Sequence, residues 1–388
     1  MRSFYEFFAG GGMARAGLGP AWRCLFANDL DPMKARAYAE NWGGEHFRLE
    51  DVARLEPADL PGVPDLVWAS FPCQDLSLAG EQQGLGRADA PSATRSGTFW
   101  PFWRLMRSLQ AQGRGPAVVV LENVLGILTA NGGRDFTAVC RALGEGGYRF
   151  GAAVMDARWF TPQSRPRVFV VAVREDVAVP SGLLAPEPSP RWSSPALRAA
   201  CARLPRGLAG RWAWWRIAEP GNAPAPFSAL VEPEPAGAPW HPPAETRKLL
   251  DSMSPLNRQK VLDAQASGAL KVGTLYRRTR PAADGARVVR AEVRFDEVAG
   301  CLRTPSGGSS RQKLLVVEGE RVRSRLLSPR EAARLMGLPD SYRLPPRYND
   351  AYHLAGDGVA VPVVRHLAEC LLEPLVQAAR SGVVLAAE

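Results

Sequence analysis

The stretch "FYEFFAGGGMARAGL", residues 4–18, joins an apolar β-type run to a short helical run through three consecutive glycines. Six more β-type runs follow before residue 175, and helical runs separate several of them. Buried strands that alternate with helices predict an α/β fold with a mostly parallel sheet covered on both faces. The expected strands are 4–9, 22–27, 46–50, 64–70, 117–123, 151–157 and 167–173, and the expected helices are 13–18, 32–42, 98–112 and 134–145.

The composition changes after the last of these strands. Two proline-rich segments, 179–195 and 219–245, exclude long regular elements there. Order returns in "RLLSPREAARLMGLP" (325–339), where Ser328 and Glu331 have the spacing of a helix capping box. The sequence therefore predicts a first domain over 1–175, a smaller irregular region over 176–325, and a return to the first domain over 326–388.

The overall composition is that of an ordinary globular protein, since 46% of the 388 residues are apolar and 22% are charged. The longest apolar runs are too short to cross a membrane, and the N-terminus lacks the layout of a signal peptide. Six cysteines lie apart without a Cys-x-x-Cys pair, which argues against a disulfide framework or a zinc site. We expect no metal, no membrane contact and a reducing, cytoplasmic environment.

The net charge of +9 is concentrated in one segment. Residues 271–330 hold fourteen Lys and Arg against six Asp and Glu, a difference of +8. A basic block on an otherwise balanced chain favours a polyanionic partner such as nucleic acid. From charge alone, a solvated surface is an equal alternative.

Glycines and polar residues follow the predicted strands, whose carboxyl ends meet at the ligand-binding edge of such a sheet. The three glycines at 10–12 allow a ligand to approach the backbone closely, beside the N–H groups of a helix N-terminus. Asn28 and Asp29 end the second strand, where an acid binds ribose hydroxyls in nucleotide-type sites. Asp51, after the third strand, is a candidate to bind an adenine amino group. A helix cap or a solvated loop acid is the alternative for each of these acids, and Asp31 is the better cap candidate.

A second group of polar residues follows the fourth and fifth strands. Cys73 lies in "SFPCQDLS" (70–77), and unpaired cysteine is more often an inert core residue than a nucleophile. A thiol attacks as thiolate and needs a partner acid to neutralise charge on its target, and Glu122, at the end of an apolar strand, is such an acid. "QSRPR" (163–167) directs two arginines toward the same edge, with structural salt bridges as the alternative.

Together these segments resemble the DNA (cytosine-5)-methyltransferase family. "FFAGGGMARAGL" is similar to its S-adenosylmethionine-binding motif, "FPCQDLS" to its nucleophile motif and "ENV" to its acid motif. "QSRPR", "RLLSPREAARLMGLPDSY" and "GDGVAVPVV" are similar to three further motifs, in the family's order. The resemblance covers roughly 4–175 and 325–375. It implies a Rossmann-like S-adenosylmethionine-dependent methyltransferase fold, with a smaller irregular target-recognition domain between the two parts.

The resemblance also implies roles for individual residues. Cys73 would attack carbon 6 of a cytosine flipped out of duplex DNA, Glu122 would hold ring nitrogen 3, and Asn123 would support that loop. Arg165 and Arg167 would orient the flipped base. Carbon 5 would take the methyl group of S-adenosylmethionine before Cys73 departs. The residues expected around this cofactor are Phe8, Ala9, Gly10, Gly11, Gly12, Asn28, Asp29, Asp51 and Pro72.

One residue departs from the family pattern. The tenth motif of the family usually opens Gly-Asn, whereas this chain has Gly356-Asp357. An acid placed close to Glu122 would need a proton or a cation, so the resemblance leaves the role of Asp357 open.

Other function classes share part of the pattern. A transfer-RNA cytosine-5 methyltransferase has the same fold, cofactor and cysteine, but the resemblance there implies a smaller recognition region and a Pro-Pro-Cys-Gln motif, whereas Phe71 precedes Pro72 here. A non-catalytic, sequence-specific DNA-binding protein would also keep the fold, and a Cys73→Ser variant would separate it from an enzyme. A nicotinamide-dependent oxidoreductase would need a glycine fingerprint that this chain lacks.

The resemblance carries expectations about the cellular role as well. It implies that the partner is double-stranded DNA and that the protein is a monomer. The protein is expected in the bacterial cytoplasm, associated with the nucleoid when it is bound to DNA. It also implies DNA marking in restriction-modification or another phage defence, with a cognate endonuclease or other defence proteins as candidate partners. The DNA recognition sequence cannot be derived from the chain, because contacts made by an irregular region follow no simple spacing.

Overall fold

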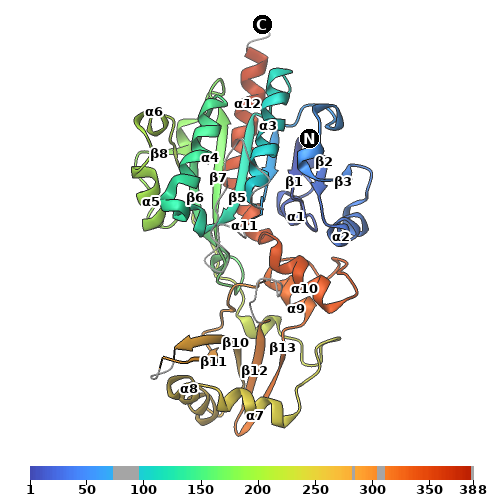
Figure 1. The fold of residues 1–388 in the computed structure, drawn as a ribbon, viewed down its shortest axis with the longest axis vertical. Helices are drawn as coiled ribbons and strands as arrows, with labels where there is room; N and C mark the ends of the chain where they lie inside the picture. Colours follow the sequence, from blue (N-terminus) through green and yellow to red (C-terminus); the bar gives the residue numbers. More distant parts are fainter. Residues whose placement is uncertain (73–95, 282–284, 304–310, 386–388) are drawn as a thin grey trace. The chain divides into compact units, whose positions relative to one another are not determined.

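A computed structural model describes residues 1–72, 96–281, 285–303 and 311–385, and the segment that begins at Cys73 lies outside these ranges. The chain divides into two compact units (Figure 1). Unit 1 comprises Met1–Asp156, Pro166–Gly221 and Val359–Glu388, and unit 2 comprises Ala157–Arg165 and Asn222–Gly358. Within the described ranges, no helix is long and apolar enough to cross a membrane.

Unit 1 is built on a seven-stranded sheet of order β3-β2-β1-β4-β5-β7-β6. The pairs from β3 to β5 are parallel, whereas β7 runs antiparallel to both β5 and β6. The predicted mixed, mostly parallel sheet is thereby confirmed. Its strands are β1 (Arg2–Phe7), β2 (Trp22–Asp29), β3 (Phe47–Leu49), β4 (Leu66–Ala69), β5 (Val118–Val124), β6 (Tyr148–Asp156) and β7 (Pro166–Arg174).

The four predicted helices of this unit form where the sequence places them. Asp31 caps the second of these helices, since its carboxylate accepts hydrogen bonds from the backbone N–H groups of Met33 (2.8 Å) and Lys34 (3.4 Å). Phe102 packs edge-on against Phe7 of the sheet, with ring centroids 5.1 Å apart. The helices are α1 (Met13–Leu18), α2 (Pro32–Trp42), α3 (Phe99–Ala111) and α4 (Arg134–Glu145).

Residues 176–221 complete unit 1, so the expected boundary at 175/176 does not coincide with the edge of the unit. The segment runs beside the outer strand β6: the N–H of Phe150 donates to the carbonyl of Arg211 (3.0 Å), and that of Ala213 to the carbonyl of Phe150 (2.8 Å). The indole N–H of Trp215 donates to the carbonyl of Val171 (3.2 Å). The tryptophan-rich stretch therefore covers an edge of the sheet. Its elements are β8 (Leu184–Ala185), α5 (Pro195–Ala202), α6 (Arg206–Ala209) and β9 (Trp214–Trp215).

Unit 2 contains an antiparallel four-stranded sheet of order β11-β10-β12-β13. A small core of apolar side chains lies between this sheet and two helices, and it includes Leu249, Val261, Leu275 and Val293. The capping box predicted at Ser328 is present, because its hydroxyl accepts from the N–H of Glu331 (3.1 Å). The elements are α7 (Pro243–Asp251), α8 (Pro255–Ala266), β10 (Lys271–Pro281), β11 (Arg287–Arg294), β12 (Lys313–Glu318), β13 (Arg321–Leu326), α9 (Pro329–Leu335) and α10 (Tyr348–Asp357).

The chain returns to unit 1 at Val359 rather than at the expected residue 326. Here α1 and α11 are in close contact, since a Cβ added to Gly17 would lie 2.3 Å from Cβ of Val364. Only a glycine permits this approach. The returning elements are α11 (Val361–Leu367), the π-helical turn η11 (Ala368–Leu372) and α12 (Glu373–Leu385).

Candidate active site

The glycine turn after β1 adopts a strained, tightly bonded backbone. Phe8 has a positive φ of 55°, and Gly10 and Gly12 have φ values of 55° and 76°. A Cβ added to Gly12 would lie 2.4 Å from the indole nitrogen of Trp42, whereas one added to Gly10 would meet no atom of the described residues within 4 Å. Only glycine fits at position 12. At position 10 the turn borders open space into which a ligand can approach the backbone.

Asp29 holds this turn from the end of β2. Its carboxylate accepts a hydrogen bond from the N–H of Gly10 (2.9 Å) and another from the N–H of Asp31 (3.0 Å). The N–H of Ala9 donates to the carbonyl of Asn28 (2.9 Å). The structure therefore brings together the predicted glycine turn and the acid of the second strand.

Two other residues expected near the cofactor have local structural partners. The side-chain amide of Asn28 donates to the carbonyls of Arg48 (3.0 Å) and Glu50 (2.8 Å), which joins β2 to the end of β3. Asp51 caps a short 3-10 turn by accepting from the N–H of Ala53 (2.9 Å). The cap alternative for Asp51 is thus present in the structure, and its contact with adenine stays a prediction.

A cluster behind the glycine turn was missed by sequence reasoning. The indole N–H of Trp42 donates to the carbonyl of Gly11 (2.9 Å), and the guanidinium of Arg15 lies 5.0 Å from the centre of the Trp42 ring. Nη1 of Arg15 also donates to the hydroxyl of Tyr38 (3.1 Å). Trp42 and Tyr38 lie on α2, so this helix supports the turn. The sequence holds a faint signal, an aromatic pair at i and i+4 on α2, which by itself indicates only a buried helix face.

Glu6 lies under the same turn and is almost fully buried, with 1% of its surface exposed. Its carboxylate accepts from the N–H of Arg15 (3.3 Å), and its second oxygen has no partner among the described residues. Burial raises the pKa of Glu6 to about 8, because a charge removed from water is unfavourable. The cofactor end of the sheet therefore contains a carboxyl that holds a proton at neutral pH.

The acid predicted to act on the base lies beside an arginine of the neighbouring strand. Because β7 is antiparallel to β5, its first residues lie next to the last residues of β5, and Val124 pairs with Arg167 in register. Nε of Arg167 is 3.2 Å from Oε1 of Glu122, and both side chains are largely buried. The reversed strand explains why a motif that precedes β7 reaches the same edge as motifs that follow the parallel strands.

Asn123 supports the segment that leads to the predicted nucleophile. Its amide nitrogen donates to the carbonyl of Phe71 (3.1 Å), and its side-chain oxygen accepts from the N–H of Val124 (2.9 Å). Pro72, which follows Phe71, is partly buried and ends the described segment. Cys73 is the next residue and lies outside the described residues.

The two arginines of "QSRPR" belong to different units. Arg165, which is 2% exposed, lies in unit 2, where its guanidinium donates to the carbonyls of Leu302 (3.1 Å), Gly356 (2.7 Å) and Gly358 (2.7 Å). Arg167 lies in unit 1 with Glu122. These contacts give Arg165 a positioning role within unit 2, and its contact with the base stays a prediction. Asp357, the residue that departs from the family pattern, ends α10 in unit 2 with an exposed side chain.

Comparison with known proteins identifies the class that this site defines. The model of the C-5 cytosine-specific DNA methylase family matches residues 2–207 and 243–373, which is most of the chain. The chain therefore belongs to the C-5 cytosine-specific DNA methylase family. It is accordingly an S-adenosylmethionine-dependent DNA (cytosine-5-)-methyltransferase.

Individual relatives agree in length with this chain. The type II methyltransferase M.NlaX of Neisseria lactamica is 26% identical over 374 residues, covering 95% of this chain and 96% of the relative. The type II methyltransferase M.HhaI of Haemophilus parahaemolyticus is 22% identical, with 94% and 92% covered. Among solved structures, the Dnmt2 methyltransferase of S. pombe has the same fold, with a TM-score of 0.56 at 18% identity over 96% of this chain and 99% of that one.

The residues around the glycine turn fit S-adenosylmethionine. Within the described residues the space beside Gly10 is open, so such a ligand can approach the backbone of the turn closely. The carboxylate of Asp29 lies at the end of β2, where ribose hydroxyls are bound in sheets of this kind. When bound, the cofactor supplies a methyl group activated by a positively charged sulfur.

Proposed function

We propose that this chain methylates carbon 5 of a cytosine within a specific double-stranded DNA sequence, through a covalent bond to Cys73. The observation that supports it most directly is the Glu122–Arg167 pair, 3.2 Å apart at the end of β5. The adjacent Asn123 bonds the carbonyl of Phe71, two residues before Cys73 in the chain. The acid and the cation thus lie at the strand end that is bonded to Phe71, from which the chain continues to Cys73.

The chemistry follows from these residue types. The target cytosine leaves the duplex at a cost of a few kcal/mol, recovered from contacts in the pocket and with phosphates. The Cys73 thiolate adds to carbon 6, which forms a carbon–sulfur bond and makes carbon 5 nucleophilic. Glu122 holds ring nitrogen 3 through a proton, which limits the negative charge that builds on the ring during the attack. Arg167 orients the base from β7, and Arg165 orients it or holds the segments around it.

The remaining steps restore the enzyme. Carbon 5 gains a methyl group, then a base removes the proton from carbon 5 while the carbon–sulfur bond breaks. The products are 5-methylcytosine, S-adenosylhomocysteine, a proton and the Cys73 thiolate. For the cofactor, we infer that Phe8, the glycine turn and Pro72 line its site, with Asp29 on the ribose and Asp51 on the adenine. Asp29 is the best supported of these, because its carboxylate already bonds the turn.

The cellular role follows as part of the proposal. Relatives such as M.NlaX and M.HhaI are named type II methyltransferases, which supports a role in restriction-modification or another form of phage defence. A cognate endonuclease or other defence proteins are then the protein partners, and the enzyme acts as a monomer. Since its substrate is chromosomal DNA, the same proposal places the enzyme in the bacterial cytoplasm, on the nucleoid.

A trapping experiment tests the mechanism. The wild-type chain, incubated with S-adenosylmethionine and duplex DNA containing 5-fluorocytosine at its site, should form a covalent adduct that survives denaturation, because fluorine blocks the final elimination. Cys73→Ser should bind the same DNA without an adduct. Bisulfite sequencing of DNA from cells that express the protein supplies the site. Methylated adenine with no modified cytosine would overturn the proposal.

A further inference from the structure

One end of the unit 2 sheet narrows to a two-stranded ribbon. Strand β12 pairs with β10 only over Lys271–Leu275. Beyond that, residues 276–281 pair with residues 287–292 alone, within the part of the chain that the structure describes (Figure 1). We name these two segments the ribbon. Most of its side chains, apart from Ala291, are exposed or half-exposed.

The charge of the ribbon is not explained by the stability of the fold. It carries five arginines (277, 278, 280, 287 and 290) against one acid, Glu292. Arg278 lies directly opposite Arg290 in the strand register. Like charges in directly opposed positions destabilise a pair of strands. An external anion bound to this exposed ribbon would offset the repulsion.

One face of the ribbon gathers most of this charge. Because opposed residues share a face and alternate along each strand, Arg278, Arg280 and Arg290 lie on the same face as Glu292. Glu292 bonds two of them: Nη2 of Arg280 is 3.0 Å and Nε of Arg278 is 3.5 Å from Oε2. Arg290 has no partner among the described residues. The face therefore keeps a net positive charge, with two guanidinium groups held in place by one carboxylate.

The same face continues toward the "QSRPR" segment within unit 2. Tyr276, next to Arg278 on this face, donates its hydroxyl to the carbonyl of Cys301 (2.9 Å). The thiol of Cys301 is in turn 3.4 Å from Nη1 of Arg165. From Arg165 the chain leads to Arg167, which is proposed to orient the base.

We propose that the ribbon enters the major groove of the DNA substrate, and that Arg278 and Arg290 hydrogen-bond guanine there. This inference rests on the proposed function, since it takes double-stranded DNA as the substrate. The major groove accommodates a two-stranded β-ribbon, and arginine matches the two acceptors, O6 and N7, of guanine. Arg277 and Arg287 lie on the opposite face and add to the positive charge of the ribbon. The recognition sequence accordingly contains guanine at the positions that this pair contacts.

The test compares sequence preference among variants. Wild type, Arg278→Ala, Arg290→Ala and Arg278→Lys/Arg290→Lys are expressed in a host without cytosine methylation, and bisulfite sequencing gives the methylated sites. Each alanine variant should lose roughly tenfold to hundredfold discrimination at a guanine position, since a bidentate contact carries that much selectivity. The lysine pair keeps the charge but should not restore the discrimination. Arg258→Ala, on α8 in the same unit, removes an equal charge and should leave the preferred site unchanged.

The outcomes distinguish a failure of the ribbon inference from a failure of the proposed function. Unchanged discrimination in the alanine variants overturns the inference. Discrimination fully restored by lysine overturns the bidentate arginine contact, because a single ammonium group would then recognise the guanine equally well. If even the wild type forms no 5-fluorocytosine adduct, the proposed mechanism fails, and the ribbon is then tested by binding alone. In that case Arg278→Ala/Arg290→Ala should lower the salt dependence of binding to duplex DNA by up to about two counterions, compared with Arg258→Ala. Equal salt dependence in both variants would refute the ribbon as a DNA contact.

Discussion

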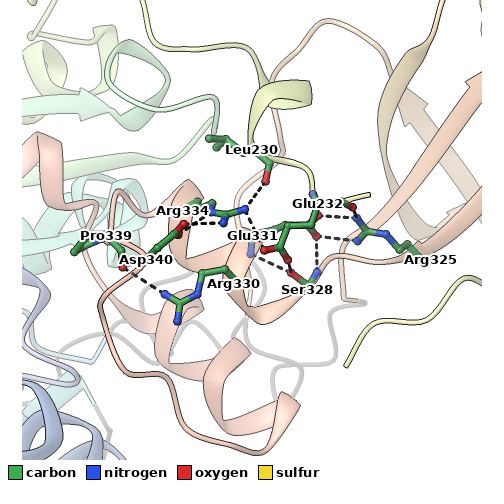
Figure 2. Close-up of polar contacts among 9 residues, drawn as sticks. All are labelled: Leu230, Glu232, Arg325, Ser328, Arg330, Glu331, Arg334, Pro339 and Asp340. Atoms are coloured by element: carbon green, nitrogen blue, oxygen red, sulfur yellow. Dashed lines mark hydrogen bonds and ion pairs between the residues drawn. The ribbon is translucent and has the colours of Figure 1, made fainter. Parts of the chain in front are cut away.

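The guanidinium of Arg325 and the carboxylate of Glu331 form an ion pair, 2.6 Å from Nη2 to Oε1, in which neither side chain has any exposed surface. Figure 2 shows the further hydrogen bonds that surround the pair. Glu331 also accepts from the N–H groups of Ser328 (2.7 Å) and Glu232 (2.7 Å), while Arg325 donates to the carbonyl of Glu232 (2.7 Å). The pair thus joins β13, α9 and the proline-rich segment into one structure.

Removing one partner of this pair should destabilise the protein strongly. Arg325→Met leaves the Glu331 carboxylate buried without its cation, and we expect a loss of about 3–5 kcal/mol in the free energy of unfolding. Arg258→Met is the matched control, since Arg258 and its partner Asp251 are both well exposed, and it should cost about 1 kcal/mol or less. Urea denaturation followed by circular dichroism measures both. Equal losses for the two variants would show that burial of the first pair does not determine its contribution.

The Glu122–Arg167 pair makes a second prediction, on catalysis. Glu122→Gln removes the group that holds the proton on the base, and the single-turnover rate of methyl transfer should fall about 100-fold to 10,000-fold. Arg167→Ala should also slow the reaction, and the double variant should be less impaired than the product of the two effects, because the residues are in contact. Arg174→Ala, at the other end of β7 with an exposed acid as its partner, is the control. Multiplicative effects in the double variant would contradict direct coupling.

Much of the fold follows from local sequence patterns. The seven strands and four helices predicted before residue 175 form close to their predicted ranges, because apolar runs, glycines and the cap at Asp31 each act over a few residues. The unit boundaries were harder to predict. Residues 176–221 join unit 1 through backbone bonds to β6, and neither their prolines nor their tryptophans indicate that long-range pairing.

The same difference applies to the site: its local motifs could be predicted from the sequence, but the contacts between distant segments could not. The Glu122–Arg167 contact depends on β7 running against its neighbours, a property of sheet topology rather than of the "QSRPR" segment. Arg165 and Arg167 are two residues apart and look alike in sequence, yet they belong to different units. Trp42 could not be assigned to the glycine turn, because their contact joins residues about thirty apart on different elements.

Trp42 provides a third prediction, on cofactor affinity. Trp42→Phe keeps a ring beneath Arg15 but removes the hydrogen bond to the carbonyl of Gly11. Loss of one such bond should weaken S-adenosylmethionine binding roughly twofold to tenfold, as measured by titration calorimetry. The methyl-transfer rate at saturating cofactor should stay nearly constant. Trp22, at the start of β2, donates an indole hydrogen bond to Glu373, and Trp22→Phe loses that bond. This variant should leave the affinity for S-adenosylmethionine unchanged. An equal effect in both variants would reduce the role of Trp42 to general stability.

Glu6 gives a fourth prediction, on the pH dependence of stability. Burial raises its pKa in the folded protein to about 8 from a usual value of 4.5. Below pH 4.5 the carboxyl is protonated in both the folded and the unfolded state, so it adds no pH dependence. Between pH 4.5 and about 8 only the unfolded chain is ionised. Unfolding then releases a proton, and the stability associated with this group falls as the pH rises.

The size of that fall can be isolated by substitution. Each pKa unit corresponds to about 1.4 kcal/mol, so the full effect across this range is on the order of 5 kcal/mol. Glu6→Gln cannot ionise, and its free energy of unfolding relative to wild type should therefore increase steadily from pH 5 to pH 8. Urea denaturation at several pH values measures this difference, and titrations elsewhere in the protein cancel from it. Glu318→Gln, at an exposed position in β12, should show no such trend. A difference between Glu6→Gln and wild type that stays constant across this range would mean that Glu6 is already ionised in the folded protein, with Arg15 as its counter-charge.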